Sequence, residues 1–444
     1  MLPVQVGNCS LQFPEPSTSI PVFRIAFMPT SLRHHSTLLV LVVCAALLLG
    51  GCGAMQRHFE TTNLTTTEIT QFSGASSRLI EQVFGGSYRD EALEQRLDQL
   101  VVNLQSAIDG NAEPVRVRIV NDSIPRSYAV PGQILLSRGL VATLKQDGLL
   151  AAVLAHELGH LRAGHWQRSL RDKPFAPVLL ATNFSEAKPS PTDVMQRRAE
   201  DYVSFLLEDG FPREDEKEAE ALGRDMLARS GYDPGLVVLS RNLLEGAMAG
   251  REILGWPRTH PDRGLRSGRD RTGFQVSPEG APTYMTDLLS MQAGYRLLDK
   301  AHLLERAGNV VEAIPVYMDA ATLAPEQSLI LTGLGMAYLQ VGELTAAHLN
   351  LRRAILNDGG YYRSRFGYGF VLDRMGRSDE AIVQLQRSIE LLPTVKAVFL
   401  LARCHARRGD IDQAVNLFRR VAAGKDTDLA KQAHQAIREL NKDE

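Results

Sequence analysis

The sequence predicts a mainly α-helical chain in two parts: a helical domain that includes a small β-hairpin, followed by an all-α repeat domain. The first part is indicated by DGLLAAVLAHELGHL at 147–161, which is rich in Ala and Leu, lacks proline and has Asp147 as its candidate N-cap. Its apolar residues fall on more than one face, which predicts a buried helix. The hairpin is indicated by RSYAVPGQILLSRGL at 126–140, where Pro131 and Gly132 suit a type II turn and QILLS suits a strand.

The second part is indicated by a pattern that recurs about every 34 residues. Glycines mark each copy, at Gly308, Gly342, Gly376 and Gly409, and an alanine follows each after five residues, at Ala313, Ala347, Ala381 and Ala414. The unit resembles the tetratricopeptide repeat (TPR), in which two helices pack closely over small residues. Four such units should stack into a superhelix whose groove holds a protein partner or peptide. The alternative is a structural platform that packs against the first domain.

Composition excludes one class of partner. The chain has 444 residues, enough for two or three domains, and its 44% hydrophobic and 23% charged residues are typical of a globular protein. Its 49 basic and 51 acidic side chains give a net charge of −2. Because nucleic-acid-binding proteins carry an excess of basic charge, we expect no nucleic-acid partner.

An apolar segment near the N-terminus predicts export and lipid attachment. Leu38 to Leu49 form a 12-residue apolar core, which is short for a membrane span and typical of a signal peptide. LLGGC at 48–52 resembles a bacterial lipobox, in which Cys52 would become the lipidated first residue of the mature chain. The alternative is an uncleaved N-terminal anchor helix. Both place the rest of the chain in the periplasm.

Met28 is the expected translation start. From Met28 the lipoprotein signal peptide would occupy residues 28–51, an ordinary length, and residues 1–27 would not be translated. In lipoproteins of Gram-negative bacteria, an Asp after the lipidated Cys usually retains the protein in the inner membrane. Gly53 stands at that position and favours the outer membrane.

Residues 156–160, HELGH, form an HExxH pattern that often binds zinc. Positions i and i+4 of an α-helix lie one turn apart on the same face, so His156 and His160 point the same way. Each can place an imidazole nitrogen about 2.0–2.1 Å from one zinc ion, with Glu157 beside them. Zinc lowers the pKa of a bound water, and a neighbouring carboxylate can take its proton. The pattern therefore predicts metal-assisted peptide hydrolysis, with two ordinary helix histidines as the alternative.

Two continuations of HExxH could supply the third protein ligand. The metzincin form HExxHxxGxxH fails, because this chain has Ala163 and Trp166 at the diagnostic positions. His165 is a poor substitute, since nine residues after His156 it falls on the opposite side of a continuous helix. We expect it on the surface or behind a metal ligand. The other continuation takes a glutamate from a later helix, and PREDEKEAEALGRDMLARSGYDPG at 212–235 is a strongly helical candidate.

This later segment resembles the distal motif RxxExEADxxG of the zinc metallopeptidases related to the CAAX prenyl protease and the bacterial heat-shock protease HtpX. The matching residues are Arg213, Glu216, Glu218, Ala219, Glu220 and Gly223. The resemblance implies that Glu216 is the third ligand of one Zn²⁺ per chain. It also implies that Glu220, which stands where the family has Asp, orients a ligand histidine or shuttles a proton.

Two more segments resemble the same family. The hairpin at 126–140 is similar to NAFAxPGG, with Arg126 where the family often has Asn, and an edge strand there could pair with an extended substrate. RTHPDRGLR at 258–266 is similar to THPxxxxR, which implies that His260 and Arg266 lie near the cleft. Either could stabilise an oxyanion, and a neutral His260 could also close the open position on zinc. The alternative is a structural His-Pro turn with a surface arginine.

The complete prediction is a helical zincin-type metallopeptidase domain with a small β-hairpin or sheet, followed by an all-α TPR superhelix. Expected boundaries are a linker at 52–75, the metallopeptidase domain at 76–270, a second linker at 271–290 and the TPR domain at 291–444.

The expected function is zinc-dependent endopeptidase activity in quality control of the cell envelope, because periplasmic members of this family that act on outer-membrane β-barrel proteins join the same two domains. Misfolded or stalled outer-membrane proteins are the expected substrates, and their assembly machinery is a candidate partner for the TPR groove. The main alternative is a periplasmic chaperone or assembly adaptor with weak or no peptidase activity. A purely structural zinc site is a third possibility.

Overall fold

The computed structural model describes residues 64–108, 113–172, 191–248, 282–424 and 427–441. The expected signal peptide and lipobox, with Cys52, lie outside these residues, as do His260 and Arg266. Within the described residues, no helix combines the length and apolar character needed to span a bilayer.

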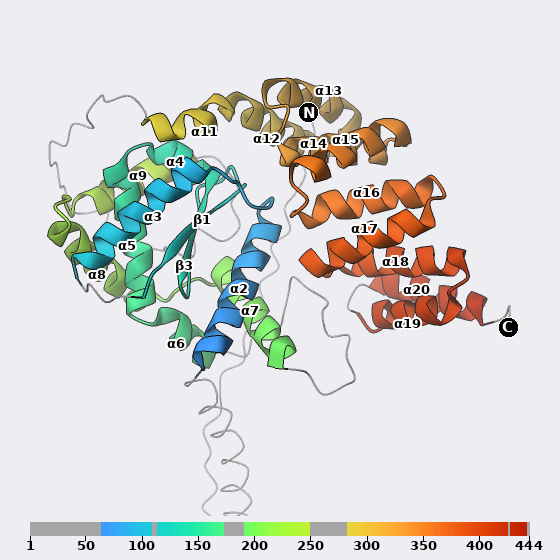
Figure 1. Cartoon of the computed structure of the whole chain (residues 1–444), viewed down its shortest axis with the longest axis horizontal. Helices are drawn as coiled ribbons and strands as arrows, with labels where there is room; N and C mark the ends of the chain where they lie inside the picture. The colour runs from blue at the N-terminus through green and yellow to red at the C-terminus, as the bar shows by residue number, and fades with distance from the viewer. Residues whose placement is uncertain (1–63, 109–112, 173–190, 249–281, 425–426, 442–444) are drawn as a thin grey trace, which may run out of the picture. The chain divides into compact units, whose positions relative to one another are not determined.

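The first part of the chain packs helices around a small sheet (Figure 1). In chain order its elements are α2 (Thr66–Val83), α3 (Glu91–Ser106), β1 (Arg116–Val120), β2 (Ser127–Val130), β3 (Gln133–Ser137), α4 (Arg138–Leu144), α5 (Asp147–Arg162), α6 (His165–Asp172), α7 (Pro191–Glu208), α8 (Arg213–Arg229) and α9 (Leu236–Met248).

The sheet has the strand order β1-β3-β2. β2 and β3 form the predicted antiparallel hairpin, and Gly132 in its turn has a φ of +72°, a conformation that favours glycine. β1 pairs with β3 in parallel, so β3 is the central strand and β2 is an edge strand. All four β2 residues are buried.

Helix α5 crosses the middle of the first part and is buried as predicted. Leu150, Leu154 and Leu158 are at most 3% exposed, and they belong to a core shared with α3, α4 and β1. The predicted N-cap is wrong: Gln146 occupies that position without a side-chain cap, and Asp147 is the first helical residue. The Asp147 carboxylate instead accepts hydrogen bonds from Arg96 and Tyr284.

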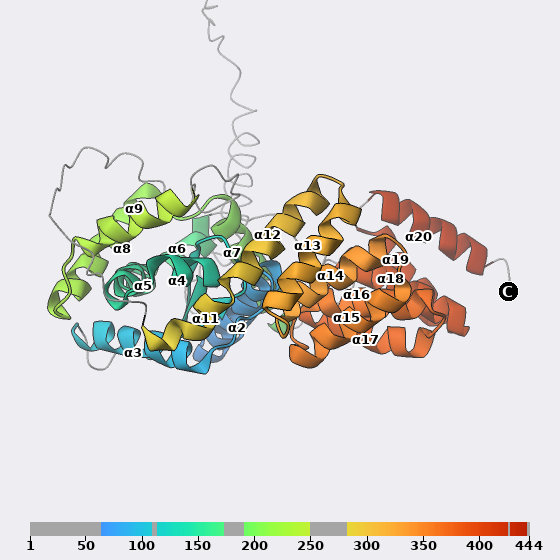
Figure 2. The same cartoon turned by 90° about the horizontal axis from the view of Figure 1, so that it is seen from above.

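The second part consists of helices in antiparallel pairs that follow one another along the chain (Figure 2). A short connection, η3 (Thr283–Met285) and α11 (Thr286–Ser290), precedes them. The helices of the second part are α12 (Gln292–Arg306), α13 (Val310–Leu323), α14 (Ser328–Gln340), α15 (Leu344–Asn357), α16 (Tyr362–Arg374), α17 (Ser378–Leu391), α18 (Val395–Arg408), α19 (Ile411–Ala422) and α20 (Thr427–Leu440).

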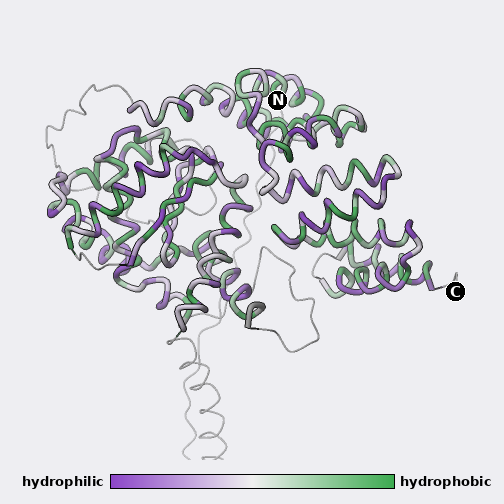
Figure 3. The backbone as a smooth tube through the Cα atoms, viewed as in Figure 1, coloured by the Kyte–Doolittle hydropathy of each residue, from purple (hydrophilic) through white to green (hydrophobic). Residues whose placement is uncertain are grey.

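The repeat pattern sets the turns and contacts of these pairs. The four marker glycines lie just after α12, α14, α16 and α18, with φ values between +77° and +86°, which glycine adopts without strain. The four marker alanines lie in α13, α15, α17 and α19 and are fully buried. Hydrophobic and hydrophilic residues alternate along these helices, as expected for helices with one packed face (Figure 3). The predicted mainly α fold is confirmed.

Candidate metal site

Helices α5 and α8 approach so closely that their backbones touch. A Cβ added to Gly159 of α5 would lie 2.4 Å from the Ala219 carbonyl oxygen, and one added to Gly223 of α8 would lie 3.0 Å from the His156 amide nitrogen. Real Cβ atoms essentially never come closer than 3.0 Å. Glycine at these two positions therefore allows α8 to bring its side chains against the HExxH turn.

This contact gathers the three predicted ligands. His156 Nε2 lies 3.1 Å from His160 Nε2 and 3.3 Å from Glu216 Oε2, and Glu216 Oε1 lies 3.5 Å from His160 Nε2. Two ligand atoms that are each about 2.0–2.1 Å from a tetrahedral zinc ion are about 3.3 Å apart. The donor set and its spacing therefore fit zinc.

Glu157, which is on α5 next to His156, lies beside these three residues. Its side chain is buried, and Ser127 Oγ donates a hydrogen bond of 2.7 Å to Glu157 Oε1. Ser127 is the first residue of β2, so the edge strand holds the carboxylate in place. Ser127 was not among the predicted site residues. It stands where the family hairpin pattern NAFAxPGG has Ala, and this difference was the signal that could have indicated it.

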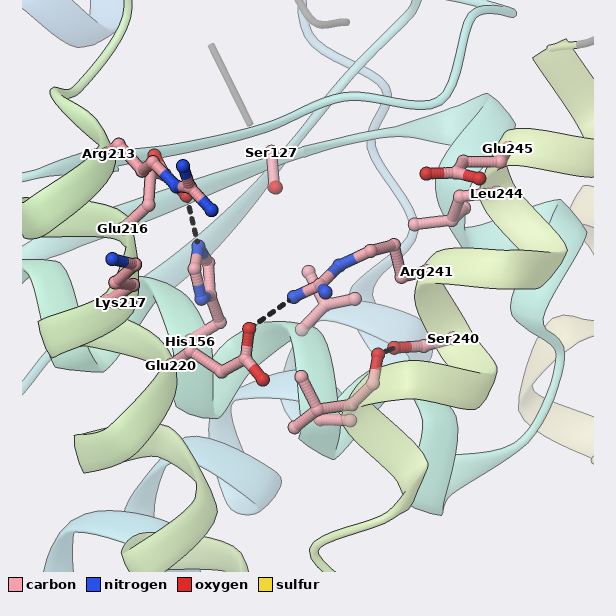
Figure 4. A pocket seen from close by; sticks show the side chains of 13 residues that line it. Ser127, His156, Arg213, Glu216, Lys217, Glu220, Ser240, Arg241, Leu244 and Glu245 are labelled. Carbon is pink, nitrogen blue, oxygen red and sulfur yellow. Dashed lines mark hydrogen bonds and ion pairs between the residues drawn. The ribbon is translucent and has the colours of Figure 1, made fainter. Parts of the chain in front are cut away.

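A pocket opens next to His156 and Glu216 (Figure 4). Its apolar lining includes Ala152 and Val153 of α5 and Leu244 of α9. Basic side chains also line it, including Arg213, Lys217 and Arg241. Because Glu216, Glu220 and Glu245 also line it, the pocket combines an apolar wall with charged side chains of both signs.

Glu220 lines the same pocket, one helical turn after Glu216. Its carboxylate accepts hydrogen bonds from Arg224 Nε at 3.0 Å and from Arg241 Nη2 at 2.6 Å. Burial acts to raise the pKa of Glu220, but the hydrogen bonds and charges of Arg241 and Arg224 outweigh it and lower the pKa overall. The hydrogen bonds that the structure shows for Glu220 thus run to arginines.

His165 is fully buried and contacts a predicted ligand. Its Nδ1 lies 2.8 Å from His160 Nδ1, and its Nε2 lies 3.2 Å from Glu218 Oε2. Of the two positions expected for His165, the surface or behind a metal ligand, the structure shows the second. Burial lowers the pKa of His165, against the raising influence of Glu218 and Asp215. Phe211 stacks on His160, with ring centroids 4.2 Å apart.

Comparison with known proteins gives matches in both parts of the chain. Residues 88–268 match the model of peptidase family M48, and residues 332–394 and 369–428 match that of the tetratricopeptide repeat. The mitochondrial metalloendopeptidase OMA1 of Arabidopsis thaliana is 28% identical over 152 residues, covering 34% of this chain and 30% of the relative. The beta-barrel assembly-enhancing protease of Escherichia coli (strain K12) is 24% identical over 184 residues, covering 38% of this chain and 37% of the relative. The chain thus spans about a third of the length of these relatives.

Solved structures match over smaller parts of the chain. A crystal structure of MamA is 25% identical and covers 32% of this chain and 80% of its own, with a TM-score of 0.28. The first TPR of Spaghetti (RPAP3), bound to an HSP90 peptide, is 20% identical and covers 27% of this chain and 95% of its own, with a TM-score of 0.26.

Proposed function

We propose that this chain, which matches peptidase family M48 and carries C-terminal tetratricopeptide repeats, is a zinc-dependent endopeptidase in cell-envelope protein quality control. The family match confirms the combination predicted from sequence and supports a metalloprotease. The observation that carries the proposal is the meeting of His156, His160 and Glu216 at zinc-ligand spacing, with the buried Glu157 carboxylate beside them.

In this proposal His156, His160 and Glu216 hold one Zn²⁺. Zinc bound by three protein side chains supplies Lewis-acid activation of water and of a carbonyl group. Glu157 takes the proton of the attacking water and returns it to the departing amine nitrogen. The hydrogen bond from Ser127 fixes one carboxylate oxygen and limits the rotation of Glu157.

The edge strand β2 gives a substrate backbone a place to pair. Strand addition recognises the peptide main chain with little side-chain preference, which suits misfolded proteins of varied sequence. Tyr202 Oη already donates a hydrogen bond of 2.6 Å to the carbonyl oxygen of Ala129. The substrate backbone should therefore pair with β2 mainly at Ser127, the end of the strand nearer the site. A substrate side chain would then enter the pocket lined by Val153 and Leu244.

Glu220 is proposed to act through Arg241. By holding the guanidinium at the pocket wall, it would aim a positive donor at a substrate carbonyl or carboxylate. This differs from the orienting or proton-shuttling role that the resemblance implies, and the two arginine contacts favour it. His260 and Arg266 remain proposed oxyanion-stabilising groups from the resemblance alone.

Two comparisons support the proposed setting. We propose misfolded or stalled outer-membrane proteins as substrates, presented through the TPR groove, and the periplasm as the location; relatives named beta-barrel assembly-enhancing protease support this setting. We also propose that lipid on Cys52 anchors the chain to the outer membrane. Replacing Cys52 by Ser should release the protein into the soluble periplasmic fraction, and unchanged membrane association would overturn the anchor.

The peptidase and adaptor hypotheses differ in what Glu157 does. Glu157→Gln keeps the shape of the side chain but cannot take a proton, so it should retain zinc and lose degradation of envelope proteins in cells. An adaptor that works through its repeats predicts an unchanged phenotype.

The ligand assignment has a separate test in metal analysis of purified protein. Glu216→Ala should lose most of its zinc, and Glu214→Ala, an exposed neighbour on α8, is the matched control. Unchanged zinc content in Glu216→Ala would exclude Glu216 as a ligand.

A further inference from the structure

The chain folds back directly after the HExxH helix. α5 ends at Arg162, Gly164 adopts a φ of +67°, and α6 begins at His165. A continuous helix would have pointed His165 away from His160, but this reversal returns its imidazole to the ligand. The two Nδ1 atoms lie 2.8 Å apart, which is hydrogen-bond distance.

The other side of His165 faces carboxylates of α8. Its Nε2 lies 3.2 Å from Glu218 Oε2 and 3.7 Å from Asp215 Oδ1. Arg168 of α6 contacts the same two carboxylates, with its Nη2 2.8 Å from Glu218 and its Nη1 3.2 Å from Asp215. Although His165, Asp215 and Glu218 have the residue types of a second metal site, the two carboxylates are paired with the Arg168 guanidinium.

The two imidazoles can share one hydrogen bond only if their protons are ordered. When Nε2 of His160 binds a metal, its remaining proton is on Nδ1, which must donate. Nδ1 of His165 must then accept, so the His165 proton is on Nε2, where the Glu218 carboxylate accepts it. Each hydrogen bond in the series from His160 through His165 to Glu218 then has one donor and one acceptor.

We propose that His165 is a positioning residue: it accepts the Nδ1–H of His160 and links that ligand to Asp215 and Glu218 on α8. Glu216 is on the same helix, between these two carboxylates. His165 therefore ties one ligand to the backbone segment that carries another. Groups that orient a metal-ligating histidine commonly change metal affinity about 10–100-fold when removed.

This inference rests on the proposed zinc site, and zinc affinity separates the two. Affinity is measured by competition with a chromophoric chelator, on the full chain, for the wild type, His165→Phe and His165→Asn. His165→Phe fills the space beside Phe211 but cannot hydrogen-bond, and should raise the zinc dissociation constant about 10–100-fold. His165→Asn keeps an acceptor oxygen near the Nδ1 position and should lie between Phe and wild type. His434→Asn, an exposed histidine of α20, is the matched control and should not change affinity.

The outcomes are distinct. If the wild type binds no zinc, the proposed function fails. If the wild type binds zinc and His165→Phe binds it equally well, only the role of His165 fails. Thermal unfolding of the metal-free variants shows whether they fold.

A measurement on the unaltered protein covers the case in which both variants unfold. Nitrogen NMR of the zinc-loaded wild type should show a protonated Nδ1 on His160 and a protonated Nε2 on His165. The opposite tautomer on His165 would overturn the proposal.

Discussion

Replacing Gly159 by alanine is expected to separate Glu216 from the two histidines. The new Cβ would lie 2.4 Å from the carbonyl oxygen of Ala219 and 2.9 Å from its Cα. Both are backbone atoms of α8, so rotating a side chain cannot relieve the contact. The helices must move apart by about 1 Å before the methyl group reaches the ordinary contact distance of 3.4 Å.

That displacement is large compared with what zinc tolerates. Metal–ligand distances in a sound site stay within about 0.2 Å of their usual values. A Glu216 carboxylate displaced by about 1 Å can no longer ligate with the histidines, so we expect zinc affinity to fall at least about 100-fold. Overpacking costs about 1–3 kcal/mol, and alanine regains about 0.5–1 kcal/mol over glycine inside a helix. The metal-free variant should thus lose up to about 2.5 kcal/mol of unfolding free energy.

Chelator competition and thermal unfolding of metal-free protein measure these two effects. Gly223→Ala is a milder version of the same change, because its added Cβ would lie 3.0 Å from the nearest backbone atoms of α5. It should therefore lose less zinc affinity than Gly159→Ala. Gly246→Ala is the matched control, because Gly246 is an exposed residue of α9 with no atom within 4 Å of its added Cβ. It should keep zinc and gain about 0.5–1 kcal/mol. Wild-type zinc affinity in Gly159→Ala would refute the reasoning.

Two further replacements test the neighbours of the candidate metal site. Ser127→Ala removes the hydrogen bond to Glu157 and should lower kcat about 10-fold, equivalent to about 1.4 kcal/mol, with zinc content unchanged; a normal kcat would show that Glu157 needs no such support. Glu220→Gln should destabilise the metal-free protein at pH 7, because the folded-state pKa of Glu220 is lowered by Arg241 and Arg224. A lowered pKa contributes stability above the unfolded value of 4.5 and loses it as pH falls through the folded value, so the urea-unfolding difference from wild type should shrink below pH 4.5. A difference that stays constant over that range would contradict the ion pairs.

Local patterns were sufficient for part of the site. His156 and His160 are one helical turn apart, so their common direction follows from helix geometry alone. The TPR glycines and alanines were equally predictable, since each acts within its own helix pair. The choice of Glu216 among the acidic residues of α8 needed the family pattern.

Helix geometry alone cannot tell which glutamate of α8 is the metal ligand. The glutamates point in different directions, and any of them could simply face solvent. In the structure Glu216 meets the histidines, Glu218 meets His165 and Arg168, and Glu220 meets Arg241. Each partner comes from another part of the chain, which a single-helix argument does not contain.

Other features depended on contacts distant in sequence or on where a helix stops. Asp147 is a good capping residue by type, but Arg96 and Tyr284, from distant segments, hold its carboxylate instead. The sequence left open whether His165 lies on the surface or behind a ligand, because a continuous helix was assumed. Gly164 was the available signal, since glycine just past a helix commonly ends it.

The packing face of α8 explains why its proposed ligand and its glycine occur together. Glu216, Ala219 and Gly223 are three and four residues apart, which places them along one face of the helix. Ala219 and Gly223 meet the backbone of α5 at Gly159 and at Ala155–His156. Glu216 is the next position along this contact face, so it must point at the HExxH turn. The small residues set the distance between the helices, and that distance brings Glu216 to zinc-ligand spacing from both histidines. A larger side chain anywhere on this face would therefore act on the metal site through the position of the helix, without contacting a ligand.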